Sequence, residues 1–203
     1  MYVLYHSPFS QHARRVVSLL EEAQLPYEIK PIDMAKGEFR SPEYLAINPN
    51  GQIPTLLDGD LKIHESNAIL RYLCNKHELT QWYPSDHKTR AVVDQWLDWG
   101  QCRMTNPVID VVLNTMFLGE NGDQEAIKQG HQQLSERLPI LDAALEDQPF
   151  LAGEQPTIAD LSIASMVFHL GLAKASPTQP NIQNWFRRIM ELQGFQRSLP
   201  PCP

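Results

Sequence analysis

The chain has 203 residues, of which 42% are hydrophobic and 20% are charged, enough to build one large or two small hydrophobic cores. Its net charge is -7, and it has no basic run and no stripe of Lys and Arg between aromatic residues, which argues against a nucleic-acid partner. No apolar run is long enough to span a bilayer, and no signal-peptide pattern follows Met1, so we expect a cytoplasmic protein without a membrane partner.

The first part of the chain alternates predicted strands and helices. Residues 2–5 are predicted to form a short apolar strand, and a helix with apolar positions at helical spacing begins near Gln11. A second strand is predicted over residues 27–31. Strand, helix and strand in this order indicate a right-handed parallel crossover. A short helical stretch near residues 42–47 follows.

A hairpin and a further helix complete this part. Residues 55–57 and 61–64 are predicted to be two short strands around an Asp-Gly-Asp turn, whose residue types tolerate positive φ. A helical pattern begins at Ser66. The hairpin adds antiparallel strands to the parallel pair, so we expect an α/β domain with a thioredoxin-like sheet over residues 1–78.

The rest of the chain is predicted to be helical. Residues 79–87 contain Pro84 and several polar residues and are predicted to be a linker. Residues 88–203 show apolar positions at helical spacing, so we expect an all-α C-terminal helical domain. Thr157 and Asp160 have the spacing of a capping box, which we assign to folding.

Two motifs beside the hairpin predict a pocket for an extended peptide. If the bond between Ile53 and Pro54 is cis, which costs little before proline, the backbone of Ile53 becomes a strand edge that can pair with a peptide. The hydroxyl of Ser66 and the first free helical N–H groups form a carboxylate site, and Glu65 can pair with an ammonium group. Taken singly, Pro54 is as well explained by starting a strand and Ser66 by capping a helix.

Ser10 is predicted at the N-terminus of the first helix, where it can stabilise a thiolate. A thiol with a pKa near 8.5 needs a shift of about two units, worth about 2.7 kcal/mol, before its thiolate dominates at neutral pH. A helix N-terminus supplies roughly 0.3 to 1 kcal/mol, up to about 2 when partly buried, and a hydrogen bond to a charged acceptor supplies about 1.5 to 3. One serine hydroxyl at this position is therefore enough.

The three cysteines do not form a pattern that binds metal or predicts a disulfide. Cys74, Cys102 and Cys202 are an odd number and lack a CxxC pair or the spacing of zinc ligands. Cys74 lies in the apolar pattern of a helix, as a small core residue does. We therefore expect no metal site.

The motifs of this chain resemble those of the cytosolic glutathione transferases, and the resemblance spans nearly the whole sequence. The matching segments, in chain order, are Ser10-Gln11-x-x-Arg14, Asn48-Pro49-x-Gly51-Gln52-Ile53-Pro54, Glu65-Ser66-x-Ala68-Ile69-x-x-Tyr72-Leu73, Tyr83-Pro84-x-Asp86, Arg90-Ala91-x-Val93, and Phe150-Leu151-Ala152-Gly153 leading into Thr157-Ile158-Ala159-Asp160. The likeness is to serine-type, bacterial, beta- or theta-like members. Beta-class members carry a cysteine where this chain has Ser10, which argues against mixed-disulfide chemistry.

The resemblance implies roles for these residues. Ser10 matches the hydroxyl that hydrogen-bonds the glutathione sulfur. The residues that match the glutathione-binding positions are Gln52, Ile53, Pro54, Glu65 and Ser66. Glutathione is thus the co-substrate, and no other cofactor is implied.

Two other hydroxyls compete with Ser10 for the catalytic role. Tyr5 falls where tyrosine-type transferases keep their activating phenol, and a phenol is a stronger donor than serine. As the last residue of a strand, Tyr5 is equally well explained by packing. Ser7, directly before Pro8, is typical of a turn. We rank Ser10 first, Tyr5 second and Ser7 third.

The family places a hydrophobic electrophile between its two domains. The candidate residues for this second-substrate pocket are Phe9, Trp99, Arg103, Met104 and Phe117, each of which is also explained by a core or surface position. The implied reaction transfers glutathione to an electrophilic carbon, as in detoxification. The alternatives are a glutathione-dependent isomerase or dehalogenase, and a non-catalytic glutathione- or ligand-binding module. We expect a homodimer, because proteins of this family usually associate in that way.

Overall fold

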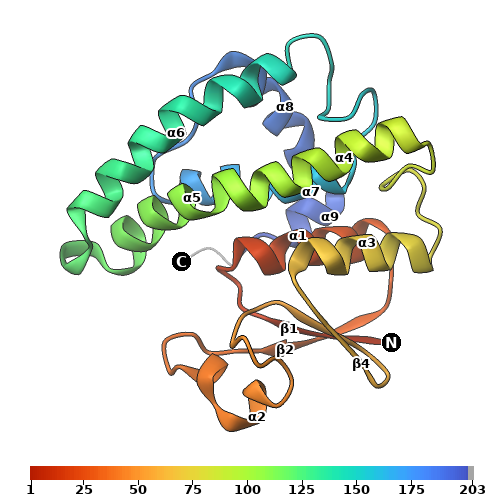
Figure 1. The fold of residues 1–203 in the computed structure, drawn as a ribbon. Coiled ribbons are helices and arrows are strands. Elements are labelled where there is room, and N and C mark those ends of the chain that lie inside the picture. Colours follow the sequence, from red (N-terminus) through yellow and green to blue (C-terminus); the bar gives the residue numbers. More distant parts are fainter. Residues whose placement is uncertain (201–203) are drawn as a thin grey trace. The chain divides into compact units, whose positions relative to one another are not determined.

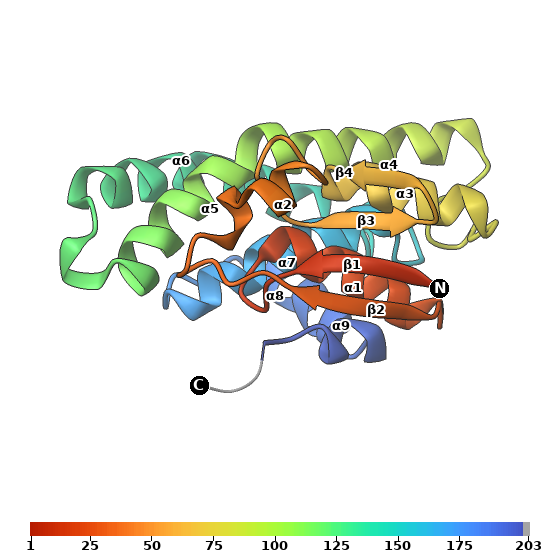
Figure 2. The ribbon, with the colours of Figure 1, turned by 90° about the horizontal axis from the view of Figure 1, so that it is seen from below.

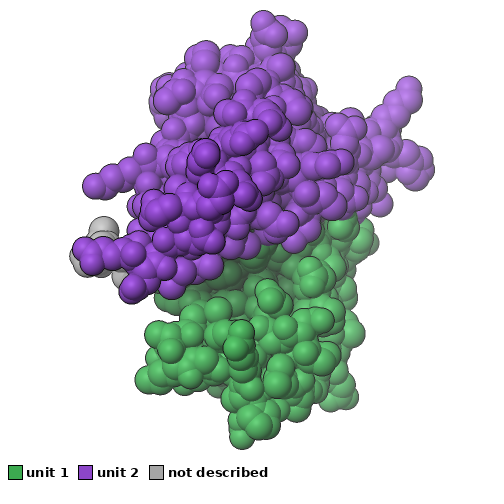
Figure 3. All heavy atoms as spheres, turned by 60° about the vertical axis from the view of Figure 1, so that its left-hand side comes forward, with its two compact units in different colours: residues 1–80, 191–203 green, residues 81–190 purple. Residues whose placement is uncertain are grey.

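The computed structural model describes residues 1–200, and they divide into two compact units (Figure 3). The first unit contains residues 1–80 together with the segment that begins at Glu191, and the second contains residues 81–190. The predicted linker lies close to this boundary, between helix α3 (Ser66–Lys76) and helix α4 (His87–Trp99).

The end of the chain differs from the predicted division, which assigned all residues after 87 to the helical domain. Helix α9 (Gln193–Arg197) packs along helix α1 (Gln11–Glu22) and belongs to the first unit (Figure 1). The two backbones meet at Gly194, where an added Cβ would lie 2.6 Å from the backbone N of Glu22. Ser18 Oγ of α1 donates to Ser198 Oγ at 2.9 Å, which fixes the segment after α9.

The first unit is built on a four-stranded sheet with the order β2-β1-β3-β4 (Figure 2). Its strands are β1 (Tyr2–His6), β2 (Tyr27–Pro31), β3 (Thr55–Asp58) and β4 (Leu61–His64). β1 and β2 are parallel and are joined through α1, whereas β3 is antiparallel to both β1 and β4. The predicted crossover, hairpin and thioredoxin-like sheet are confirmed.

Helices cover the two faces of this sheet. Figure 1 shows α1 and α3 on one face and the short helix α2 (Pro42–Leu45) on the other. Alternate residues of β1, among them Leu4 and His6, are buried on the α1 side. Tyr5 points to the α2 side, where it packs against a cluster that contains Tyr44.

The second unit is helical, as predicted, apart from one isolated β-bridge between Phe150 and Gly153. Its α-helices are α4, α5 (Thr105–Val112), α6 (Gln124–Ala144), α7 (Ile158–Leu172) and α8 (Pro180–Met190). Two π-helical turns, η2 (Gly100–Met104) and η3 (Leu113–Phe117), lie at the two ends of α5, and short 3-10 turns, η1 (Glu38–Arg40) and η4 (Gly119–Asn121), occur elsewhere in the chain. α7 is buried on nearly all sides and is the central helix of the unit.

The start of α7 is held by the predicted capping box. Thr157 Oγ1 accepts from Ala159 N, and the Asp160 carboxylate accepts from Thr157 N at 2.8 Å. The same carboxylate also accepts from Leu151 N and Trp185 Nε1, both at 2.9 Å. Asp160 is completely buried, so these bonds replace the water that its charge would otherwise require.

The cysteines and the helix lengths complete the description. Cys74 is buried and Cys102 is exposed, and Cys202 lies outside the described residues. Within residues 1–200, no three His, Cys, Asp or Glu side chains gather as metal ligands would. No helix in that range combines the length and the apolar character needed to cross a bilayer.

Candidate active site

The strand register brings three predicted segments to the same end of the sheet in the first unit. Tyr5 of β1 pairs with Thr55 of β3, and Thr55 pairs with His64 of β4. The chain that follows β1, the chain that precedes β3 and the chain that follows β4 therefore all emerge at this end. They are the turn Ser7–Ser10, the Ile53-Pro54 peptide and the Glu65-Ser66 pair.

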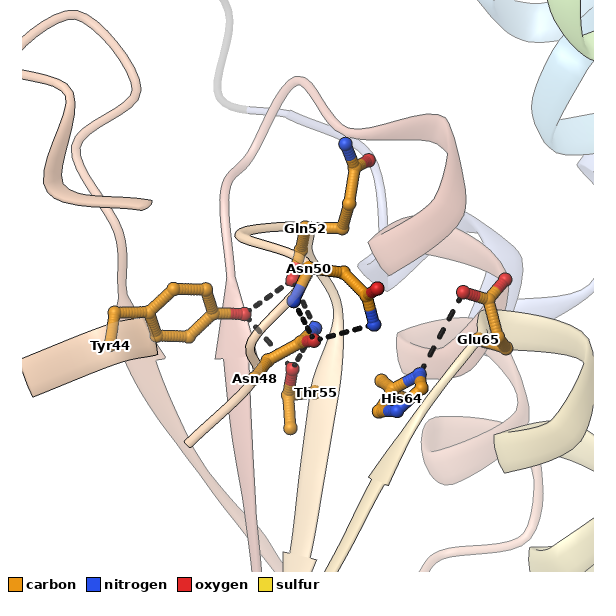
Figure 4. A network of polar contacts seen from close by, with 7 residues as sticks. All are labelled: Tyr44, Asn48, Asn50, Gln52, Thr55, His64 and Glu65. Carbon is orange, nitrogen blue, oxygen red and sulfur yellow. Dashed lines mark hydrogen bonds and ion pairs between the residues drawn. The ribbon is translucent and has the colours of Figure 1, made fainter. Parts of the chain in front are cut away.

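The loop before β3 is fixed by the side-chain amide of Asn48, which is buried (Figure 4). Asn48 Nδ2 donates to the carbonyl oxygen of Gln52 at 2.8 Å and to Thr55 Oγ1 at 3.0 Å. Asn48 Oδ1 accepts from the backbone N and from Nδ2 of Asn50, both at 3.1 Å. One side chain thus holds both ends of the loop that precedes the strand.

Tyr44 of α2 supports the same loop from the other side. Its hydroxyl donates to the carbonyl oxygen of Gln52 at 2.6 Å and lies 2.9 Å from Thr55 Oγ1. The peptide bond between Ile53 and Pro54 is cis, the isomer that the peptide-pocket hypothesis needs. The network therefore holds the Ile53 backbone in place, while the exposed Gln52 side chain projects from the loop (Figure 4).

Ser10 caps the N-terminus of α1. Its backbone is extended, with φ -85° and ψ 114°, and its Oγ accepts from Ala13 N at 3.1 Å. A hydroxyl has one hydrogen to donate and two lone pairs, so this cap leaves the hydrogen of Ser10 available to a ligand. Ser10 is half-buried at the positive end of a 12-residue helix, the setting that favours a thiolate.

The two competing hydroxyls lie in less suitable places. Tyr5 is on the α2 face of the sheet, with its ring centroid 5.4 Å from that of Tyr44, whereas α1 covers the opposite face. Ser7 is buried, and its carbonyl oxygen accepts from Ser10 N at 3.0 Å, which closes the predicted turn. This placement favours Ser10, and the catalytic roles stay predictions.

The N-terminus of α3 is open. Glu65 occupies the N-cap position with φ 67° and ψ 105°, a strained conformation for a residue other than glycine, and its side chain makes no capping hydrogen bond. The first turn begins at the buried Ser66, and an anion can accept hydrogen bonds from its N–H groups. The exposed Glu65 carboxylate lies 3.8 Å from His64 Nδ1 (Figure 4).

The burial of three basic groups beside this site is not predicted by the sequence analysis. Arg14 and Arg15 of α1 are both completely buried, and burial lowers the pKa of Arg15 to about 9, so its guanidinium stays charged at neutral pH. His6 is 8% exposed, and burial together with the positive charge of Arg14 lowers its pKa to about 4. The available signal was the position of both arginines inside an otherwise apolar run.

The predicted electrophile residues are divided between exposed and buried positions. Four of them keep exposed surface: Phe9, Trp99, Arg103 and Phe117, the last with 49% of its side chain exposed. Trp99 packs edge-on against Trp96, with ring centroids 5.1 Å apart. Met104 has no exposed surface and is a core residue, because a side chain without exposed surface cannot contact a substrate. The use of the other four in a pocket stays a prediction.

Comparison with known proteins connects this geometry to a family. The family model for the N-terminal domain of glutathione S-transferase matches residues 1–75, and the model for the C-terminal domain matches residues 104–193. A probable glutathione S-transferase of rice (Oryza sativa subsp. japonica), GSTF2, is 34% identical over 201 residues, covering 96% of this chain and 94% of the rice protein. Human glutathione S-transferase theta-2B is 37% identical over 194 residues, covering 92% of this chain and 80% of the human protein.

Solved structures give the same relationship. Poplar glutathione transferase F1 superposes with a TM-score of 0.89 at 30% identity, covering 97% of this chain and 95% of the poplar chain. Human glutathione transferase theta-2, crystallised in complex with glutathione and an unknown ligand, has a TM-score of 0.89 at 30% identity, covering 98% and 86%. These relatives are plant and human proteins, so the theta-like part of the predicted resemblance is supported and the bacterial part is not.

Proposed function

Because this chain belongs to the glutathione S-transferase family, we propose that it binds glutathione at the described end of the sheet, holds the sulfur as a thiolate and joins it to a hydrophobic electrophile. The predicted enzyme class is confirmed by the family models and the relatives. The observation that carries the finer proposal is the meeting of three elements at one end of one sheet: the Ser10 cap, the cis peptide before Pro54 and the open N-terminus of α3.

Each part of the tripeptide has a matching group in the first unit. The Ile53 backbone pairs with the cysteinyl unit, in the manner of an added strand. The Ser66 hydroxyl and the N–H groups of the first turn of α3 take the α-carboxylate of the γ-glutamyl end, while Glu65 pairs with its ammonium group. Gln52 contacts the glycyl or γ-glutamyl group. The binding of glutathione by human theta-2 supports this choice of ligand.

The chemistry depends on a local rather than a global field, because the net charge of -7 does not attract an anionic tripeptide. The thiol loses its proton to solvent, and the thiolate accepts the Ser10 hydroxyl hydrogen at the positive end of α1. This bond and the helix together supply about the 2.7 kcal/mol that a shift of about two pKa units requires. The thiolate then forms the new carbon–sulfur bond by attack on the electrophilic carbon. In a substitution the leaving group departs with the electron pair of its bond to that carbon, and in an addition the π bond breaks and the resulting carbanion takes a proton from solvent.

A titration of bound glutathione tests this proposal. Thiolate absorbance is followed against pH for the parent protein and for Ser10→Ala, Tyr5→Phe and Ser7→Ala. We expect Ser10→Ala to raise the thiol pKa by about one to two units and to slow turnover about 10- to 100-fold, since it removes one hydrogen bond to a charged acceptor. Tyr5→Phe and Ser7→Ala should stay close to the parent. Unchanged thiolate formation and turnover in Ser10→Ala would show that the serine assignment is wrong.

A substrate panel separates transfer from the alternative functions. Electrophiles are supplied with glutathione, and the loss of both compounds is measured. A transferase consumes the two in equal amounts, whereas an isomerase consumes only its substrate and a dehalogenase also releases halide. A non-catalytic binding module would bind glutathione without lowering its thiol pKa. Sedimentation of the parent protein tests the proposed homodimer, which follows from the usual assembly of the family.

A further inference from the structure

Arg15 carries a buried positive charge, and only part of its guanidinium group forms hydrogen bonds within the described residues. The side chain is completely buried, and its Nη1 donates to Asn67 Oδ1 at 3.1 Å. Its Nε and Nη2 are also buried and have no hydrogen-bond partner within residues 1–200. No carboxylate among residues 1–200 forms an ion pair with Arg15. A buried charge left in this state costs free energy, so its retention calls for a compensating role.

Asn67, the partner of Arg15 in the described part of the chain, lies in the first turn of α3. Asn67 directly follows Ser66 in that turn, where the backbone N–H groups of a helix have no acceptor within the helix itself. The hydrogen bond from α1 therefore fixes the turn from beneath, on the buried side of the helix. Both the N-terminus of α3 and the guanidinium are positive, so an anion at the open turn would be favoured by the two together.

We propose that Arg15 is a positioning residue for the carboxylate of the γ-glutamyl end of glutathione, which it serves by holding Asn67 and by placing a positive charge under the first turn of α3. This inference rests on the proposed function, because it concerns the same ligand. Arg15 does not touch glutathione itself in this arrangement. It acts through the direction of the N–H groups of the turn and through its charge.

A pair of ligands isolates this role. Binding is measured by calorimetry for glutathione and for an analogue in which 4-aminobutanoyl replaces the γ-glutamyl group, so that only the α-carboxylate is missing. We expect Arg15→Met to weaken glutathione about tenfold, the equivalent of one charged interaction, and to change the affinity for the analogue less than twofold. The thiol pKa of bound glutathione should remain at the parent value, because the sulfur lies at α1 and not at α3.

Three further variants control for folding. Ser18→Ala removes another buried hydrogen bond of α1, to Ser198, and should leave both affinities unchanged. Arg15→Lys retains the charge and should recover part of the lost affinity. Asn67→Ala breaks the link but retains Arg15, and it should weaken glutathione more than the analogue. If Arg15→Met does not fold, the affinities of Asn67→Ala for glutathione and for the analogue test the proposal in its place.

The outcomes separate this inference from the proposed function. If the parent binds glutathione no better than the analogue, the carboxylate site and the role of Arg15 are both wrong. If the parent prefers glutathione but Arg15→Met and Asn67→Ala weaken the two ligands equally, glutathione recognition stands and Arg15 is only structural. A shift of the thiol pKa in Arg15→Met with unchanged affinity would also overturn the proposal.

Discussion

The helices α3 and α7 begin in opposite ways. At the start of α7, the side chains of Thr157 and Asp160 close the capping box, and every oxygen of that carboxylate is occupied by donors of the same unit. At the start of α3, Glu65 adopts a strained backbone conformation and caps nothing. A helix start that satisfies its own donors stabilises the fold, whereas one that leaves them open remains available to a ligand.

The two buried charges beside these helix starts differ in the same way. The carboxylate of Asp160 accepts hydrogen bonds from three other residues, whereas among the described residues the guanidinium of Arg15 has Asn67 as its single hydrogen-bonding partner. Complete satisfaction makes a buried charge structural, because removing it leaves several donors unpaired. When a buried charge next to an open helix start has only some of its hydrogen-bonding groups paired, we infer that it has a function other than packing within the chain.

The largest expected effect comes from removing the carboxylate that closes the start of α7. Asp160→Ala should destabilise the second unit by about 4 kcal/mol, because it leaves buried donors without a partner. Thr157→Ala, which removes one cap, should cost only about 1 kcal/mol. Urea unfolding followed by tryptophan fluorescence reports on this unit alone, since all 4 tryptophans lie within residues 81–190. Equal losses in the two variants would contradict the role given to Asp160.

The second-largest effect concerns stability in acid, and it comes from His6, the buried histidine at the end of β1. The pKa of His6 is about 4 in the folded protein against 6.5 ordinarily, so between these values the unfolded chain binds a proton that the folded chain does not. Stability should therefore fall as the pH drops from 6.5 to 4, by up to about 3 kcal/mol. Hydrogen exchange at the β1 amides measures this loss. In His6→Gln the slope should be nearly flat, and an equal slope would assign the loss to other groups.

A third prediction concerns the strain at the open helix start. Glu65→Gly should raise the stability of the first unit by about 1 kcal/mol, because glycine adopts positive φ without strain. The same change should weaken glutathione, since the carboxylate that pairs with the ammonium group is lost. Glu65→Ala is the matched control, with the same loss of affinity and no gain in stability. Hydrogen exchange in α3 and calorimetry measure the two effects. A Glu65→Gly protein that binds as tightly as the parent would show that the strain serves no ligand.

The smallest effect is expected at the exposed side chain of the cis-proline loop. Gln52→Ala should weaken glutathione about threefold, as the loss of one exposed hydrogen bond does, and leave stability unchanged. Asn48→Ala, by contrast, removes the bonds that hold the loop and should reduce stability and affinity together. Parallel unfolding and binding curves distinguish the two variants. A stability loss in Gln52→Ala equal to that of Asn48→Ala would remove the distinction between ligand contact and loop support.

The features that were predictable from the sequence depend on neighbours in the chain. The strand bounds follow from alternation over a few residues, and the capping box of Thr157 and Asp160 is a contact across three positions. The cis bond before Pro54 was also anticipated, because only proline makes that isomer inexpensive. The hairpin pattern likewise predicts that the Ile53-Pro54 peptide and the Glu65-Ser66 pair are neighbours, whereas Ser10 is connected to them only through the family resemblance.

The features that were missed depend on contacts between distant residues. Periodicity cannot show that Arg15 is covered by α3, because its partner Asn67 lies 52 positions away. It also cannot show that Ser18 meets Ser198, a separation of 180 positions, or that α9 packs along α1. The burial of His6 and Met104 belongs to the same class, since residue type alone does not determine which neighbours cover a side chain.

The return of the chain to the first unit has a consequence for its synthesis. Residues 1–80 leave the ribosome early, but the helix that packs along α1 is made only after residues 81–190. The intervening helical unit must therefore be translated before the thioredoxin-like half can bury the outer side of its first helix. A nascent chain halted before residue 190 would display that surface to chaperones, and a single proteolytic cut near residue 80 would divide the first unit between two polypeptides while leaving residues 81–190 on one.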